Sequence, residues 1–377
     1  MNKKVLLITS YPLNNEPVIR NRLLPFITVA IEKGYKVIVT SPDDKVFIKA
    51  GLEFTHVLSP DLNIKPTSFV KRFFFEFKQS RRLLKAAKFI DSDLTLVTIP
   101  SMFLLFNVHL LKSEKLILDI RDLVWEYISD SNFINRIAKS LFKRLARINL
   151  KRASVILATN SDEIEYLKNF NIGNKHILHV TNGVSAEQFN KLSVVTSNGS
   201  TKQTPSVAYI GNVGLAQDLT CLIDVAISMP DVTFYIVGEG TDYPAIKQYV
   251  TKNNVNNVML LGRISWDEVI NVYNKVDILY AQLTPDFASA MPSKLYEYLS
   301  TGKYIIYGGM EQAESILKQF THNTVIPPSD RQALKQALEH VIQQGFYREN
   351  NQANKDIVKS HFIREDSVNK VFNYFEK

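Results

Sequence analysis

Short apolar runs alternate along this chain with longer stretches in which apolar residues recur every three or four positions. In the first half, the runs lie at residues 5–8, 36–40, 94–98, 116–119, 155–158 and 176–180. Such runs are typical of strands buried on both faces, and the three-to-four spacing is typical of helices packed against a sheet. The pattern predicts an α/β fold with parallel strands.

The same alternation begins again in the second half, with apolar runs at residues 207–210, 233–237, 258–261, 278–281, 304–306 and 324–326. The polar stretch 193–206 between the halves lacks any apolar period and is predicted to be a linker. We therefore predict two Rossmann-like domains, 1–192 and 207–345, that face each other across a cleft. A helical segment at 346–377 is free to pack back on the first domain. Ligands are expected at the carboxyl ends of the strands.

Composition narrows the class of protein. The 377 residues suit two domains, and 45% hydrophobic with 22% charged residues is globular. No apolar run approaches the roughly 20 residues of a membrane span. A lone cysteine, Cys221, and the lack of any Cys or His cluster suggest a reducing cytoplasm and no metal site. The net charge of +8 favours an anionic partner.

The segment 291–303 is the strongest single candidate for a binding site. Ser293 can cap a helix that follows Pro292 and ends at Gly302, with Leu295 on its apolar face. The free N–H groups at such a helix start favour a phosphate, and Lys294 adds a full charge there. Glu297 lies one turn on, where its carboxylate can accept hydrogen bonds from sugar hydroxyls. The alternative is an ordinary capped helix with a surface Lys–Glu pair.

Three strand-to-helix turns of the second half carry further candidates. The turn after the first strand contains Gly211, Asn212 and Gly214, and glycine allows close approach of the backbone to a ligand. Glu239 and Arg263 follow the next two strands and are able to contact a nucleotide. The alternatives are a simple turn and, for Arg263, an ion pair with Asp267 or Glu268.

In the first half, charged residues and an indole follow a predicted strand at 118–126. One of Asp119, Arg121 and Asp122 is expected to form a structural ion pair, and Arg121 or Asp122 is expected to meet substrate.

Basic residues interleaved with Phe and Leu concentrate at 69–85 and 136–147. Such helices suit an anionic lipid surface. The alternatives are helices that solvate their charges, and nucleic acid, which no accompanying motif supports.

Taken together, these residues resemble the family 4 glycosyltransferases of the GT-B fold, in particular the bacterial enzymes that build lipopolysaccharide and capsule sugars. The motifs that carry the resemblance are residues 119–123 (DIRDL), 181–184 (TNGV) with Phe189, 209–217 (YIGNVGLAQ), 236–240 (IVGEG) and 292–298 (PSKLYEY).

The resemblance implies transfer of a sugar, of the hexosyltransferase type, from a nucleotide diphosphate sugar, UDP-linked, to a lipid-linked saccharide. It implies donor binding by the second domain through Lys294, Glu297, Ser293, Leu295 and the Gly211–Gly214 turn. The first domain would take the acceptor, with Arg20 and Asp119 on that side and Asp122 and Arg121 as catalytic candidates. No metal or other cofactor is implied, and many members retain the anomeric configuration. The enzyme is expected in the cytoplasm, peripheral on the inner face of the membrane, without a nucleic-acid partner.

The chain departs from the family pattern at two places. Ser289 stands eight positions before Glu297, where the family has a second glutamate, and Asp286 is the nearest acid. Residues 10–17 (SYPLNNEP) replace a glycine-rich loop after the first strand, and Arg20 is a candidate to do part of its work. Two alternatives remain, a nucleotide-sugar epimerase and a non-catalytic subunit that binds saccharide or nucleotide sugar.

Overall fold

The computed structural model describes all residues except 1–2, 61–68, 129–130, 197–204, 288–292 and 377. The chain forms two compact units. Unit 1 comprises Met1–Asn182 and Arg364–Lys377, and unit 2 comprises Gly183–Ile363. Within the described part of the chain, no helix is long and apolar enough to cross a membrane.

Unit 1 is built on a parallel sheet, which has seven described strands in the order β3-β2-β1-β4-β5-β6-β7. The strands are β1 (Lys4–Ile8), β2 (Lys36–Ser41), β3 (Thr55–Leu58), β4 (Leu94–Ile99), β5 (Leu116–Ile120), β6 (Val155–Ala158) and β7 (His176–His179). The helices are α1 (Pro17–Glu32), α2 (Phe69–Ala87), α3 (Met102–Asn107), η1 (Val108–Leu110), α4 (Phe133–Leu150), α5 (Ser161–Lys168) and α14 (Arg364–Glu376).

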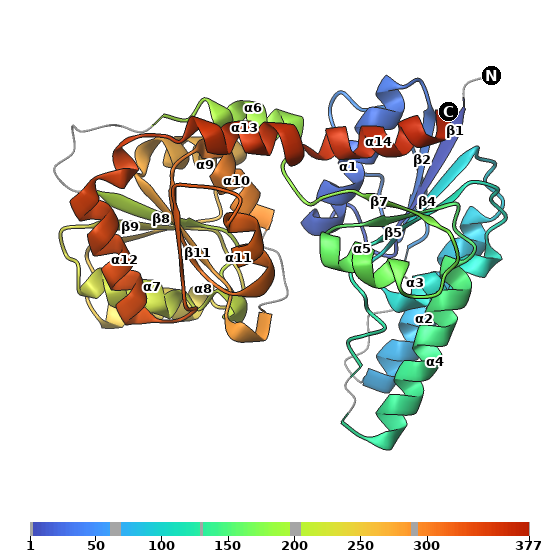
Figure 1. Cartoon of the computed structure of the whole chain (residues 1–377), viewed down its shortest axis with the longest axis horizontal. Coiled ribbons are helices and arrows are strands. Elements are labelled where there is room, and N and C mark those ends of the chain that lie inside the picture. Colours follow the sequence, from blue (N-terminus) through green and yellow to red (C-terminus); the bar gives the residue numbers. More distant parts are fainter. Residues whose placement is uncertain (1–2, 61–68, 129–130, 197–204, 288–292, 377) are drawn as a thin grey trace. The chain divides into compact units, whose positions relative to one another are not determined.

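Alternate residues of the central strand β1 enter opposite cores of unit 1. Val5 and Leu7 pack with α1 and α14 on one face, and Leu6 and Ile8 pack with α2 to α5 on the other. Figure 1 shows α14 lying alongside α1. Both faces of the sheet are therefore buried, and its carboxyl edge is left for the loops that follow the strands.

Unit 2 repeats this layering around a parallel sheet with six described strands in the order β10-β9-β8-β11-β12-β13. The strands are β8 (Ser206–Ile210), β9 (Thr233–Val237), β10 (Val258–Gly262), β11 (Ile278–Gln282), β12 (Tyr304–Gly308) and β13 (Asn323–Ile326). One face is covered by α7 (Leu219–Ile227), α8 (Tyr243–Lys252) and α12 (Arg331–Gln344). The other is covered by α6 (Ala186–Ser193), α9 (Trp266–Lys275), α10 (Ser293–Thr301), α11 (Glu311–Leu317) and α13 (Gln352–His361). Short turns of helix lie at η2 (Leu215–Gln217), η3 (Pro285–Phe287) and η4 (Phe346–Arg348).

The contact boundaries differ from those expected of the sequence. We predicted a first domain at 1–192 and a linker at 193–206, whereas unit 1 ends at Asn182. The difference arises because α6 packs against α10 and places its apolar side chains in the core of unit 2. Residues 197–204 of the predicted linker lie outside the described residues. At the other end, α13 stays with unit 2 and α14 returns to unit 1, which divides the predicted segment 346–377 at Arg364.

Candidate functional site

Helix α10, which carries the predicted Lys–Glu pair, is fixed to the sheet of unit 2 by one tyrosine. The Tyr298 hydroxyl accepts a hydrogen bond from the N–H of Ile210 (2.7 Å) and lies 3.1 Å from the Ile210 carbonyl. The side chain is fully buried. Since Ile210 is the last residue of β8, the first turn of α10 lies beyond the carboxyl end of this strand, on the side of the Gly211 turn.

Lys294 and Glu297 meet on that first turn. Their side-chain atoms Nζ and Oε2 are 2.8 Å apart, and the side chains are 36% and 9% exposed respectively. The Lys294 ammonium also lies 5.5 Å from the ring centroid of Trp266, at the start of α9, in a cation–π contact. The pair presents one cation and one carboxylate on the same helical face, as their three-residue spacing predicted. Trp266 was not predicted, because its place in the fold depends on α9 packing beside α10.

The other predicted residues of this helix differ in what they can contribute. The Leu295 side chain is fully buried in the core of unit 2, so it cannot touch a ligand, and only its backbone N–H remains available to a site. Ser293 begins α10, but its side chain lies outside the described residues, as do Pro292 and Ser289.

The three glycine-containing turns at the carboxyl edge of unit 2 are joined by backbone hydrogen bonds. The N–H of Gly211 donates to Val237, and the N–H of Gly238 donates to Gly262, at 2.9 and 2.8 Å. A Cβ atom on Gly238, whose φ is +131°, would lie 1.8 Å from the Gly211 carbonyl oxygen. Glycine is required at Gly238 for this close approach. The turns therefore form one connected platform beside α10.

Within the first turn, the Gln217 side chain closes the loop. Its Oε1 atom accepts hydrogen bonds from the N–H of Gly214 (3.2 Å) and from the Asn212 amide (3.4 Å). Asn212 is exposed on this platform. The predicted residues Gly211, Asn212 and Gly214 thus share one ordered turn.

Glu239 and Arg263 are both exposed at the same edge. The backbone carbonyl of Glu239 accepts a hydrogen bond from Val213 N–H (3.0 Å), so the backbone of this residue belongs to the platform. Within the described residues Arg263 forms no ion pair. The alternative pairing with Asp267 or Glu268 is therefore not made.

In unit 1, Asp119 forms the structural ion pair expected of one member of its cluster. Its carboxylate accepts two hydrogen bonds from Arg22, at 2.6 and 3.1 Å. Arg22 also donates to the Val180 carbonyl (2.8 Å), and the two charged side chains are 4% and 0% exposed. This corrects the assignment of Asp119 to acceptor contact, because a fully buried carboxylate with both oxygens bonded to Arg22 cannot reach a ligand.

Arg121 and Asp122 are the first two residues after β5. Burial and the nearby charge of Arg22 lower the pKa of Arg121, whose Nε has no hydrogen-bond partner among the described residues. Asp122 has exposed surface, yet the protein packed around its carboxylate raises its pKa. A hydrogen bond from the Tyr127 hydroxyl (3.0 Å) and the charge of Arg121 oppose that rise. A carboxylate with a raised pKa is a candidate proton acceptor.

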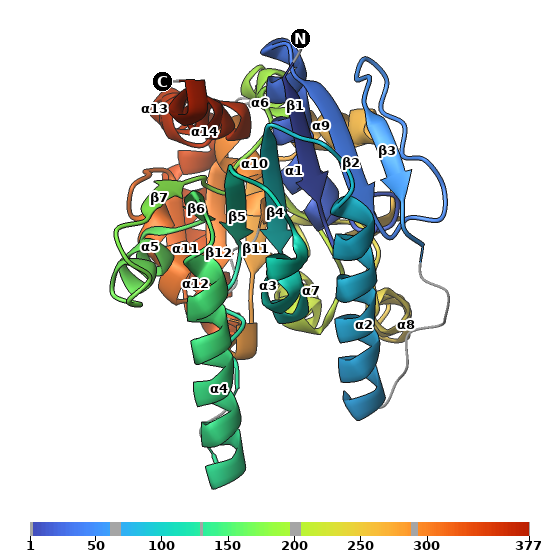
Figure 2. The same ribbon diagram turned by 90° about the vertical axis from the view of Figure 1, so that its right-hand side faces the viewer.

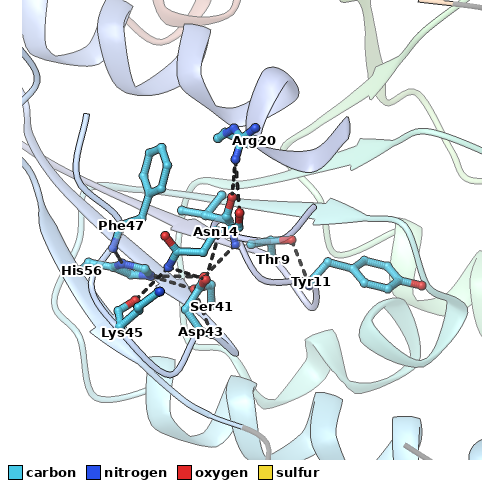
Figure 3. Close-up of polar contacts among 10 residues, drawn as sticks. Thr9, Tyr11, Asn14, Arg20, Ser41, Asp43, Lys45, Phe47 and His56 are labelled. Carbon is cyan, nitrogen blue, oxygen red and sulfur yellow. Dashed lines mark hydrogen bonds and ion pairs between the residues drawn. The ribbon is translucent and has the colours of Figure 1, made fainter. Parts of the chain in front are cut away.

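The loop after β1, which replaces a glycine-rich turn, is held from two sides (Figure 3). Arg20 donates to the carbonyls of Leu13 and Asn14, both at 3.3 Å. From the other side, the Asp43 carboxylate accepts hydrogen bonds from the N–H groups of Leu13 (2.7 Å) and Asn14 (2.9 Å). Arg20 therefore shapes this loop from within unit 1.

Asp43 belongs to a buried network that sequence reasoning missed. Its carboxylate accepts from the Ser41 hydroxyl, which is 2.7 Å from Nε2 of His56. Nδ1 of His56 accepts from Phe47 N–H (2.9 Å), which assigns the remaining ring proton to Nε2. Burial lowers the pKa of His56, although Asp43 opposes the shift. The signal that could have revealed Asp43 is its place two residues after β2, at the carboxyl edge.

No group of three or more His, Cys, Asp or Glu side chains in the described part of the chain is arranged to hold a metal ion.

Comparison with known sequences finds a match in unit 2. Residues 204–344 match the family model described as glycosyl transferases group 1. The uncharacterized glycosyltransferase MJ1178 of Methanocaldococcus jannaschii is 33% identical over 128 residues. This stretch covers 32% of the present chain and 33% of the relative, so the chain matches about a third of that protein's length.

Solved structures match over nearly the whole chain. Sucrose-phosphate synthase from Thermosynechococcus elongatus has a TM-score of 0.71 and 15% identity, covering 100% of this chain and 98% of that chain. HepE from Anabaena, in complex with UDP, has a TM-score of 0.67 and 15% identity, covering 99% of both. The lipopolysaccharide outer core galactosyltransferase WaaB has a TM-score of 0.64 and 16% identity, covering 98% of this chain and 99% of that chain.

These likenesses, together with two parallel sheets layered by helices, establish the architecture. The chain has the GT-B fold, which it shares with these solved structures, and its residues 204–344, which carry Lys294 and Glu297, match the family model of the glycosyl transferases group 1.

Proposed function

We propose that the protein transfers a hexose from a nucleotide diphosphate sugar, UDP-linked, to a lipid-linked saccharide in the synthesis of a cell-surface polysaccharide. The observation that carries the donor assignment is the Lys294–Glu297 pair on the first turn of α10, beside the connected glycine turns. The family match of this segment supports it, as does the UDP bound by the structurally similar HepE.

On the donor side, Lys294 and the backbone N–H groups at the start of α10 would bind the diphosphate. Glu297 would accept hydrogen bonds from the ribose hydroxyls, since a carboxylate offers more lone pairs than the one contact with Lys294 uses. The Gly211–Gly214 turn would lie beside the sugar, with Glu239 and Arg263 at the edge. Positive charge held near the leaving diphosphate stabilises it as the glycosidic bond breaks, so we expect no requirement for a metal ion.

On the acceptor side, Asp122 is the residue of unit 1 best suited to bind or deprotonate an acceptor hydroxyl. The raised pKa of its carboxylate and its accessibility favour this role, and Arg121 beside it is a second candidate for contact with substrate. Retention of the anomeric configuration is the stereochemistry that we propose, by analogy with family 4 enzymes.

The surface of α4 supports a membrane partner for unit 1. Phe133, Ile137, Leu141 and Ile148 are all 48% or more exposed and lie on one helical face. Beside this stripe, basic side chains including Arg136 line a shallow groove. Figure 2 shows α4 running beyond the strands of unit 1. An apolar stripe flanked by cations is the surface that a helix presents to anionic lipid. We propose peripheral attachment at the inner face of the cell membrane.

Nucleotide titration of the purified full-length protein tests the donor assignment. UDP, GDP, ADP and CMP are added separately while the unfolding temperature is followed, because a ligand at 100 times its dissociation constant stabilises the fold by about 2.7 kcal/mol. We expect selective stabilisation by UDP, and release of UDP from a UDP-sugar on addition of acceptor without added metal. Lack of stabilisation by every nucleotide diphosphate would refute the donor site. Conversion of a UDP-sugar to its epimer without acceptor would instead identify an epimerase.

Vesicle sedimentation tests the membrane assignment separately. Vesicles of phosphatidylcholine with one third phosphatidylglycerol are expected to retain the protein at low salt and to release it as salt rises. Each basic residue near the surface contributes about 1 kcal/mol, so the double variant Arg136→Gln, Arg144→Gln should bind roughly 30-fold more weakly. The matched control is Lys247→Gln with Lys252→Gln on α8 in unit 2. Equal retention of both double variants would contradict the role of α4.

A further inference from the structure

The side chain of Gln282, the last residue of β11, is buried in unit 2 and is 2% exposed. Its Nε2 atom donates hydrogen bonds to the backbone carbonyls of Gln217 (2.8 Å) and Asp218 (2.9 Å). Its Oε1 atom accepts hydrogen bonds from the Tyr280 hydroxyl (2.7 Å) and from the N–H of Ser329 (3.0 Å). A side-chain amide has two donor and two acceptor positions, so all of them are used.

Two of the residues that this amide binds have a backbone conformation that is uncommon outside glycine. The φ angle is +37° at Asp218 and +58° at Ser329. Such conformations persist where the surrounding contacts hold them, and they are concentrated at ligand sites. Gln282 bonds to the carbonyl of one residue and to the N–H of the other. One buried side chain therefore holds two loops at the carboxyl edge of unit 2, the loop after β8 and the loop after β13.

The loop after β8 contains the Gly211–Gly214 turn, which Gln282 reaches through Gln217. The carbonyl of Gln217 accepts the bond from Gln282, and its side-chain Oε1 atom accepts from Gly214 N–H (3.2 Å) and from the Asn212 amide (3.4 Å). Asn212 itself is exposed. The buried amide and an exposed residue of the turn are thus connected by successive hydrogen bonds.

Two further contacts hold the same arrangement. The N–H of Thr284, two residues after Gln282, donates to the Ala216 carbonyl (2.9 Å), so the end of β11 supports this loop at a second point. On the neighbouring strand β12, a Cβ atom on Gly308 would lie 2.9 Å from Oε1 of Gln282. Glycine at that position leaves the room that the amide occupies.

The consequence for a ligand follows from the division of the proposed donor site. In that site Lys294 and Glu297 on α10 bind the diphosphate and the ribose, whereas the Gly211–Gly214 turn lies beside the sugar. Hydrogen bonds weaken steeply when their distance or angle changes, so a displaced turn would lose contacts with the sugar. A turn that is already ordered also loses little conformational freedom on binding. The contacts of UDP on α10 would be unaffected.

We propose that Gln282 is a positioning residue for the sugar of a nucleotide diphosphate sugar. Its amide is buried and fully bonded within the protein, so it does not touch the ligand and acts through Gln217 and Asn212. The inference rests on the proposed donor site for the identity of the ligand. Its structural consequence, the order of residues 211–218, is measurable without any ligand.

The test compares two variants at Gln282 with a matched control. Gln282→Met keeps the length of the side chain and removes all of its amide bonds. Gln282→Glu keeps the acceptor for Tyr280 and Ser329 but loses at least one bond to the loop, and it replaces the methionine variant if that variant does not fold. The control is Asn257→Met, because the Asn257 amide also donates to backbone carbonyls of unit 2, three of them within residues 226–232, at 2.9 to 3.0 Å.

Hydrogen exchange of the full-length protein is the measurement that needs no ligand. The N–H groups of Gly214 and Gln217 are both bonded within the turn. We expect Gln282→Met to speed their exchange at least tenfold, because the turn opens locally when its support is removed, and Asn257→Met to leave it unchanged. Unchanged exchange in the Gln282 variant would overturn the proposal.

Calorimetric titration measures the effect on the ligand. The probes are UDP, UDP-glucose, UDP-galactose and UDP-N-acetylglucosamine. For the UDP-sugar that the unsubstituted protein binds most tightly, the ratio of its dissociation constant to that of UDP should rise about fivefold in the Gln282 variant, as the loss of one hydrogen bond requires. The affinity for UDP should change less than twofold, and Asn257→Met should leave the ratio unchanged. An unchanged ratio, or equal weakening of UDP and the UDP-sugar, would overturn the proposal.

The two measurements distinguish a failure of this inference from a failure of the proposed function. If the unsubstituted protein binds none of the four probes, the proposed donor site is refuted, and with it the ligand that we assign to the turn. If UDP binds and the Gln282 variant leaves the ratio unchanged, the proposed donor site stands and only the role of Gln282 is refuted.

Discussion

Replacing Lys294 with methionine should weaken the binding of UDP while leaving the binding of uridine intact. The Lys294 ammonium is paired with Glu297 at 2.8 Å and braced by Trp266, so it is already held at the start of α10. A phosphate oxygen about 4 Å from this ammonium would gain about 1 to 4 kcal/mol, depending on solvent screening. The side chain is 36% exposed, which screens the charge and places the expected loss near 2 kcal/mol.

A loss of about 2 kcal/mol corresponds to a dissociation constant roughly 30-fold higher. Isothermal titration calorimetry would measure it for UDP and for uridine, which has the base and the ribose but no phosphate. Methionine keeps the length of the side chain, so packing on Trp266 is largely maintained. The matched control is Lys318→Met, which removes a lysine from another helical ion pair of unit 2, Lys318 with Glu314 at 2.9 Å, and should change neither affinity.

Glu297→Gln completes the comparison because it acts on the other half of the ligand. Loss of the carboxylate charge should weaken UDP and uridine alike, by about fivefold, since both carry the ribose. The reasoning would be refuted if Lys294→Met changed UDP affinity less than threefold, or if it weakened uridine as strongly as UDP. In the second case Lys294 would support the fold of the site and would not bind the phosphate.

Two further predictions concern unit 1. Arg22→Met should destabilise the protein by about 3 to 5 kcal/mol in urea unfolding, because it leaves Asp119 buried without its partner, whereas Lys4→Met, from a solvent-exposed pair with Asp91, should cost less than about 1 kcal/mol. Similar losses for both variants would contradict a buried pair. Burial lowers the pKa of His56 below its ordinary 6.5, so the folded protein binds a proton at this residue less readily than the unfolded chain does. The contribution of neutral His56 to the free energy of unfolding is therefore fully present above about pH 6.5 and is lost as the pH falls through the lowered pKa. His56→Asn, which keeps an acceptor for Phe47 N–H, should flatten the dependence of the unfolding temperature on pH below about 6.5, and an unchanged slope would count against it.

Most of the fold could be predicted from the sequence, because parallel strands that are covered on both faces consist of consecutive apolar residues. Each of the twelve predicted runs corresponds to a strand of the structure. The strand that was missed, β3, lies at the edge of its sheet, and its residues are all exposed or half-buried. A half-buried edge strand need not be continuously apolar, so the segment Thr55–Leu58 gave no run to detect.

The Lys294–Glu297 pair of the proposed donor site could be predicted because its geometry is local. Lys294 and Glu297 are three positions apart on one helix, so their spacing alone brings them together. The residues that brace them are not local. Trp266 reaches Lys294 only because α9 and α10 pack on the same face of unit 2, and Tyr298 reaches Ile210 across 88 positions of the sequence. No periodicity within either segment encodes those contacts.

Unit 1 shows the opposite case, and this difference bears on how the proposed acceptor and donor sites are built. The loop after β1 takes its shape from Asp43, about thirty positions away, and Arg22 meets Asp119 across 97 positions. Such contacts form only when the whole sheet is assembled, and a substitution in one segment affects the distant segment that it contacts. The charged residues that a sequence shows beside a strand end are therefore ambiguous in unit 1. Asp119 looks like a ligand-binding carboxylate and is a buried ion-pair partner, whereas Asp122, three positions on, keeps the accessible carboxylate with a raised pKa. Burial and pairing, which only the folded unit determines, decide which of the two carboxylates is accessible to a ligand.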